Sequence, residues 1–171
     1  MPLLPSVLRN RLWHSTTPAR YQLILASGAI LPEPEMPDSA RWGTAQGPEF
    51  YPYVRFLGGV SLFDFSDFDE KKYEKKFPLS NWHSFVPQNE LEGNKVWLEI
   101  DPARVGDSLF TGKALLQRWK KEEAYKHKVM PEVEAAHMGP VPLLAVAQVL
   151  LFSQGKWSHI AKPATPSAAA A

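Results

Sequence analysis

Two glutamates stand two residues apart in segment 130–143, between a lysine-rich stretch and an apolar run. On a strand, Glu132 and Glu134 would point to the same face. Like charges this close repel, so one of the two carboxyls should have a raised pKa, which suits acid–base or charge-stabilising chemistry. On the exposed edge of an ordinary strand the same residues would have no chemical role. Both interpretations are open on these residues alone.

A histidine is followed at once by three hydroxyl residues near the N-terminus. His14 precedes Ser15, Thr16 and Thr17, and a short amphipathic segment ending in Gly28 comes next. A histidine and hydroxyls in one place form a compact set of donors and acceptors for a ribose or a phosphate. A structural histidine that completes hydrogen bonds at a strand end is the alternative.

An aromatic stretch, "GVSLFDF", lies in the middle of the chain. Phe63 and Phe65 alternate with other residues, so one strand face would carry both rings. One ring, together with Ser61, could pack against a flat heterocycle, and Arg55 could bind a phosphate bidentately. Core packing is the alternative, and we expect it to hold for most of these rings.

Segment 113–128 is rich in basic residues. Its lysines include Lys120, Lys121, Lys126 and Lys128, beside Trp119, Tyr125 and His127. Such a mixture of cations and aromatic rings could contact a nucleic-acid backbone, and a solvated helix face would explain it too.

The composition excludes several kinds of functional site and partner. The absence of cysteine excludes disulfides, thiolate metal sites and a cysteine nucleophile, and His127 and His137 have no recognised zinc spacing, so we predict no metal. The net charge of +1 produces no global field that favours nucleic acid or a membrane. We expect a cytoplasmic protein with no membrane partner, because no apolar run approaches the roughly 20 residues that cross a bilayer.

Short strands and helices must position these residues, since sixteen prolines and ten glycines disfavour a helix bundle. Periodicity predicts strands at residues 11–14, 53–57, 60–65, 96–100 and 132–138, and helices at 18–27, 67–77 and 112–128. A long loop should cover residues 29–50, and residues 143–153 should begin as a helical turn and end as a strand. The expected class is α+β, with a single domain over residues 1–160 and a flexible low-complexity tail over 161–171.

Three segments, taken in order, resemble the ADP-ribosyltransferase fold. They are "WHSTTPARYQLILASGAILP" from Trp13, "GVSLFDF" from Gly59, and "EAAHMGPVPLLAVAQVLLF" from Glu134. The resemblance is to the compact branch that includes DNA-targeting ADP-ribosyltransferase toxins and RNA 2′-phosphotransferases. It implies split antiparallel β-sheets with a few short helices around a central cleft for NAD, which is consumed as a substrate.

The resemblance also implies roles for particular residues. Glu134 would be the catalytic glutamate that stabilises an oxocarbenium-like transition state, and Glu132 would orient or deprotonate the acceptor. The cofactor would be held by the remaining candidates, which are His14, Ser15, Thr16, Arg55, Ser61 and one ring from Phe63 or Phe65.

The leading prediction is an NAD-dependent ADP-ribosyltransferase, such as a small toxin or effector, that modifies a protein or a nucleic acid. One alternative keeps the fold and transfers a 2′-phosphate from RNA, which requires several arginines in one cleft. Another is a non-catalytic α+β module that binds protein or nucleic acid through its basic helix. The sequence leaves open which acceptor is used and whether an antitoxin or immunity protein is a partner. We expect acceptor specificity in the loops at residues 33–49 and 71–93.

Overall fold

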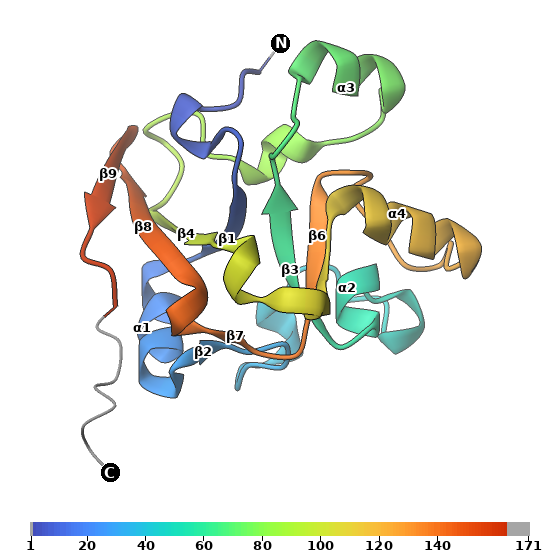
Figure 1. The fold of residues 1–171 in the computed structure, drawn as a ribbon, viewed down its shortest axis with the longest axis horizontal. Coiled ribbons are helices and arrows are strands. Elements are labelled where there is room, and N and C mark those ends of the chain that lie inside the picture. Colours follow the sequence, from blue (N-terminus) through green and yellow to red (C-terminus); the bar gives the residue numbers. More distant parts are fainter. Residues whose placement is uncertain (1, 164–171) are drawn as a thin grey trace.

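The computed structural model describes residues 2–163 (Figure 1), so residues 164–171 of the predicted tail lie outside the described part. The strands are β1 (Leu12–Thr16), β2 (Ala29–Ile30), β3 (Gly59–Asp64), β4 (Lys95–Ile100), β5 (Leu109–Phe110), β6 (Glu134–Met138), β7 (Val141–Pro142), β8 (Val146–Ser153) and β9 (Lys156–Ile160). The α-helices are α1 (Pro18–Ser27), α2 (Tyr53–Phe56), α3 (Glu70–Lys76) and α4 (Gly112–Lys121), and short 3-10 turns connect several of these elements. The predicted α+β class is confirmed.

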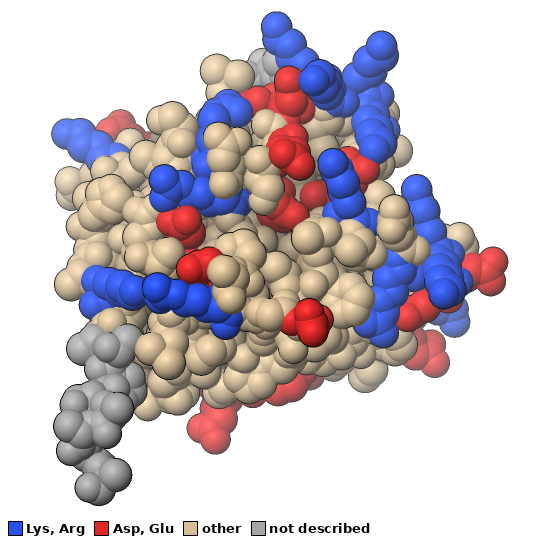
Figure 2. Space-filling view, viewed as in Figure 1, with Lys and Arg blue, Asp and Glu red and all other residues tan. Residues whose placement is uncertain are grey.

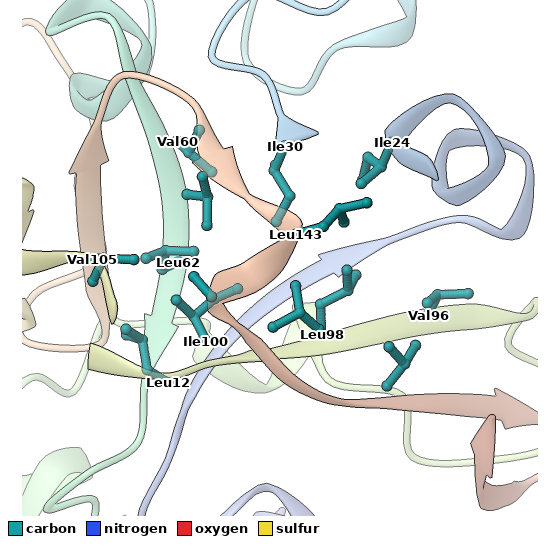
Figure 3. Close-up of a cluster of buried hydrophobic side chains, with 14 of the residues drawn as sticks. Leu12, Ile24, Ile30, Val60, Leu62, Val96, Leu98, Ile100, Val105 and Leu143 are labelled. Atoms are coloured by element: carbon teal, nitrogen blue, oxygen red, sulfur yellow. The ribbon is translucent and has the colours of Figure 1, made fainter. Parts of the chain in front are cut away.

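Seven of the strands form one antiparallel sheet in the order β5-β6-β3-β1-β4-β8-β9. Its middle is weakly joined, because β1 and β3 pair only at Leu12↔Asp64 and Trp13↔Phe63. By contrast, β1 pairs with β4 over five positions and β3 pairs with β6 over five. The strands β1 and β3 therefore diverge beyond Trp13 and leave a fork in the sheet, which is visible in Figure 3.

An aliphatic cluster fills one face of the sheet around this fork. Figure 3 shows side chains of α1, β2 and the turn after β7 meeting those of the strands, and the labelled members are Leu12, Ile24, Ile30, Val60, Leu62, Val96, Leu98, Ile100, Val105 and Leu143. Each buried side chain of this kind contributes about 1.5–3 kcal/mol through burial. The cluster fixes α1 and the two-stranded sheet β2-β7 against the fork.

An aromatic cluster covers the other face. Successive strand residues point to opposite faces, so Trp13 and Trp97 lie opposite to Leu12 and Leu98. The Trp13 and Trp97 rings meet edge to face with centroids 6.4 Å apart. The N-terminal residues and the segment between α3 and β4 complete this packing.

The helix α1 has the ends that its sequence predicts. The Thr17 hydroxyl accepts from the backbone N–H of Arg20 at 3.3 Å, Pro18 occupies the first helical position, and Gly28 ends the helix with φ of +77°. Since His14–Thr16 leads directly into this helix, its start sets where the β1 hydroxyls lie. The expected strands around β3 and β4, the helix around α3, and the helical turn followed by β8 are also present.

Several predicted elements differ from those observed, and the predicted loop at residues 29–50 begins with the strand β2. Residues 53–57 were expected as a strand, and Tyr53–Phe56 is a single helical turn instead, bracketed by Pro52 and by Gly58 with φ of +73°. The basic helix ends at Lys121 rather than at residue 128, because Glu123 adopts φ of +52° and turns the chain. Within residues 2–163, no helix has the length and apolarity needed to cross a bilayer.

Candidate functional site

A cleft of about 1470 Å³ opens at the fork between β1 and β3. Its walls come from β1, α1, β3, the start of β6, and the two long connections before α2 and after α3. Small-molecule pockets usually occupy about 300–1,000 Å³. The cleft therefore has room for a dinucleotide-sized ligand and part of a second reactant.

The carboxylate of Glu134 lies in this cleft and is held at both oxygens. The Ser61 hydroxyl donates to Oε1 at 2.9 Å, and the backbone N–H of Met130 donates to Oε2 at 3.0 Å. The pairing of Phe63 with Glu134 across β3 and β6 sets this register, so Ser61 and Glu134 share one face of the sheet. Two donors on different segments fix the orientation of the carboxylate before any ligand arrives.

Burial raises the pKa of Glu134, and the hydrogen bonds from Met130 and Ser61 partly oppose this rise because they favour the charged form. No lysine or arginine among residues 2–163 lies within ion-pair distance of this carboxylate. A preorganised carboxylate without a protein counter-ion is suited to stabilising a positive charge that develops on a ligand.

His14 lies across the fork from Glu134 and is linked to the same serine. Its Nδ1 is 3.0 Å from the backbone carbonyl oxygen of Ser61. A carbonyl oxygen only accepts, so Nδ1 carries the proton and Nε2 is the acceptor of the neutral ring. Burial lowers the pKa of His14, which keeps the ring neutral at pH 7. The Nε2 of a neutral imidazole can accept from a ribose hydroxyl.

Most of the residues predicted for the cofactor are brought together in the cleft. Ser15 and Thr16 continue from His14 along β1 where it has left β3, and Phe63 lies one strand away beside Glu134. Arg55 reaches the cleft from α2, and its guanidinium stacks on the Tyr51 ring at 3.8 Å. The contribution of each to ligand binding stays a prediction.

Glu132 does not share a strand face with Glu134, and the prediction that it does is wrong. The strand β6 begins only at Glu134, and Glu132 has φ of +57° in the preceding turn. Its carboxylate pairs with Lys76 of α3 at 2.5 Å and does not line the cleft. The turn is pressed against α4, since a Cβ on Gly112 would lie 1.9 Å from the Glu132 carbonyl oxygen. Glycine at position 112 therefore allows the Glu132 turn to lie close to α4, and β6 begins directly after this turn, at Glu134.

Phe65 also lies outside the cleft. It follows the end of β3, where its N–H donates to the Arg11 carbonyl at 3.0 Å, and its ring is fully buried against Phe68 and Trp82. Phe63 and Phe65 belong to one aromatic cluster, as their alternation predicts, but only Phe63 lines the cleft.

Four residues of the cleft wall, three of them from the two long loops, were not predicted as site residues. Arg41 and Trp42 line the cleft from the first loop, Phe85 from the second, and Arg20 from α1. Trp42 packs edge to face on Phe85 with ring centroids 5.5 Å apart, and the ring centroids of Phe85 and Phe63 are 6.1 Å apart. This aromatic wall joins segments that are far apart in sequence, so no local pattern could have revealed it.

The basic segment 113–128 contributes to the cleft mainly through its last turn. Trp119, Tyr125, His127 and Lys128 line the wall. His127 is buried, with Nδ1 2.7 Å from the Tyr51 carbonyl and its ring stacked on Phe56. Figure 2 shows lysines and arginines over α3 and α4 with acidic residues among them, so this face is mixed in charge.

No cluster of three or more His, Asp or Glu side chains within residues 2–163 is arranged to hold a metal ion. Comparison with protein-family models, with curated proteins and with solved structures finds no match to this chain.

Proposed function

We propose that this chain is an NAD-consuming ADP-ribosyltransferase whose reaction centre is the His14–Ser61–Glu134 group in the fork of the sheet. The observation that carries the proposal is the Glu134 carboxylate, which Ser61 and Met130 hold in the cleft and which has no ion-pair partner among residues 2–163. The resemblance in sequence assigns the catalytic role to the same glutamate.

The bond that breaks is the one between ribose C1′ and the nicotinamide ring nitrogen, which keeps the electron pair and leaves as neutral nicotinamide. Positive charge then develops over C1′ and the ribose ring oxygen, as in glycoside hydrolysis. Glu134 would hold a ribose hydroxyl and stabilise that charge. An acceptor nucleophile, or water, forms the new bond to C1′ and loses a proton.

The remaining cleft residues have positions that suit the other parts of NAD. The neutral His14 ring can accept from a ribose hydroxyl, with the Ser15 and Thr16 hydroxyls alongside. Phe63 offers a half-buried ring beside Glu134 on which a nicotinamide ring could stack. A ring at this position would place the breaking bond near the carboxylate.

The proposal is tested by incubating the purified protein with NAD and quantifying free nicotinamide and ADP-ribose by chromatography. We expect release above the spontaneous rate and an NAD-dependent rise in Tm, because a ligand of the folded state stabilises it according to its concentration over its Kd. His14→Ala should reduce both signals. The absence of nicotinamide release together with the absence of a thermal shift would refute the proposal.

RNA 2′-phosphotransfer is a second candidate, favoured by one specific observation. This activity requires several arginines in one cleft, and Arg20, Arg41 and Arg55 all line this one. An RNA with an internal 2′-phosphate, offered together with NAD, would distinguish the two activities. Removal of the 2′-phosphate would favour the second candidate, and nicotinamide release without RNA would favour the first.

A further inference from the structure

One carboxylate of the first long loop lies between two arginines of the cleft. Glu33 Oε2 is 2.5 Å from Arg41 Nη1, and Glu33 Oε1 is 3.7 Å from Arg55 Nε. Asp38, from the same loop, accepts from Arg55 Nη2 at 2.9 Å. Two guanidinium groups therefore converge on a single anionic group supplied by the protein itself.

The arginines in these ion pairs are more deeply buried than the acidic residues. The side chains of Arg41 and Arg55 are 15% and 11% exposed, whereas those of Glu33 and Asp38 are each 62% exposed. The cations thus belong to the wall of the cleft, and the acids lie over them from the solvent side. Exposed partners in ion pairs contribute little to stability, so the acids can be replaced at small cost.

The Arg55 guanidinium is held in place and is incompletely satisfied. The Tyr51 ring fixes its plane by stacking at 3.8 Å. Its Nε and Nη1 atoms are buried and make no hydrogen bond to any group in residues 2–163. Buried donors without hydrogen bonds are costly in a folded protein, and the acceptor oxygens of a bound anion would satisfy them.

Arg20 supplies a third cation, close to Arg41. It lines the cleft from α1, and its Nη2 donates to the Ala40 carbonyl beside Arg41. The guanidinium fork matches phosphate oxygens bidentately, and phosphate offers more acceptor oxygens than a carboxylate. Two arginines that converge on one point, with a third in the same cleft, fit an anion with more than one phosphate group.

We propose that Arg41 and Arg55, with Arg20, form a diphosphate-binding site and that the Glu33 carboxylate occupies the place of a phosphate group until the ligand displaces it. The identity of the natural ligand as a dinucleotide rests on the proposed function, whereas the site itself does not. Glu33 is then an internal competitor that lowers the affinity for anions.

Isothermal titration calorimetry with inorganic pyrophosphate and with ADP-ribose tests this site. Glu33→Gln should bind pyrophosphate about two- to fivefold more tightly, the change that corresponds to an exposed ion pair of up to about 1 kcal/mol. Arg41→Gln should weaken binding at least about tenfold, as expected for the loss of charge-assisted hydrogen bonds. Arg104→Gln is the matched control, because Arg104 also pairs with an acid and donates to a carbonyl but lies outside the cleft.

The gain in affinity of Glu33→Gln cannot arise from misfolding, so it separates the proposal from a merely structural role of the loop. Unchanged or weaker pyrophosphate binding in Glu33→Gln would overturn the proposal, as would equal losses in Arg41→Gln and Arg104→Gln. Tighter binding of adenosine 2′-monophosphate than of pyrophosphate would overturn the diphosphate assignment. Pyrophosphate has no glycosidic bond, so its binding is independent of whether the protein releases nicotinamide.

Discussion

Replacing Ser61 with alanine removes the hydroxyl that donates to Glu134 Oε1 at 2.9 Å and leaves the carbonyl that holds His14 unchanged. This hydrogen bond favours the charged form of the carboxyl, so its loss raises the pKa of Glu134 further above the ordinary value. A hydrogen bond to a charged group is worth about 1.5–3 kcal/mol. Because Ser61 is exposed and water can replace its hydroxyl, the lower end of this energy range applies. It corresponds to a shift of the Glu134 titration by about one pH unit.

The assay is the pH dependence of kcat/KM for nicotinamide release. If ionised Glu134 is required, the acid limb in Ser61→Ala should move about one pH unit toward neutral pH. A 13C NMR titration of the Glu134 carboxyl carbon measures the same shift without turnover. Ser66→Ala is the matched control, since the Ser66 hydroxyl donates to the Asp64 carboxylate at 2.6 Å and neither residue lines the cleft. An acid limb and a Glu134 titration that are the same in Ser61→Ala and wild type would refute the reasoning.

Three further predictions concern stability. Burial raises the pKa of Glu134, so the stability that this carboxyl contributes at low pH is lost as the pH rises from its ordinary pKa to its raised pKa. Glu134→Gln should therefore have a higher Tm than wild type at pH 7 and an equal Tm at pH 4. Burial lowers the pKa of His14, so stability is lost as the pH falls from about 6.5 through the lowered pKa of this ring. Calorimetry of His14→Gln should show a shallower loss of stability over that range. An identical loss in the variant and in wild type would contradict a buried, neutral His14. Gly112→Ala places a Cβ 1.9 Å from the Glu132 carbonyl oxygen. The substitution should lower the free energy of unfolding by about 3 kcal/mol and Tm by about 6–12 °C. An unchanged Tm would show that α4 is not in close contact with this turn.

The parts of the fold that the sequence predicted are those in which the determining residues are neighbours in the chain. Thr17, Pro18 and Gly28 specify both ends of α1, and the apolar alternation of β3 and β4 specifies their faces. The hydrogen bond from Ser61 to Glu134 joins two strands that are 73 residues apart in sequence, so only the separate candidates, and not their contact, could be predicted from residue types.

The errors have a common physical origin in contacts with other segments. Nothing near Glu132 in sequence indicates its φ of +57°, which is set where the turn meets Gly112 of α4. The helical turn at Tyr53 is likewise tied to a distant segment, since its N–H donates to the Lys128 carbonyl at 2.8 Å. Arg41 was overlooked because it lies in a loop without periodicity, where only the folded chain shows that it faces Arg55 across Glu33.

The central claim is that the Glu134 carboxylate acts on the glycosidic bond of NAD, and the ratio of nicotinamide release rates in two glutamine variants tests it most directly. Glu134→Gln removes the charge in the cleft, and Glu132→Gln removes one only two residues away that pairs with Lys76. Loss of one preorganised electrostatic group typically costs about 10²–10³ in kcat. We predict a loss of that size in Glu134→Gln and a rate within about twofold of wild type in Glu132→Gln. Equal rates in the two variants would contradict the account.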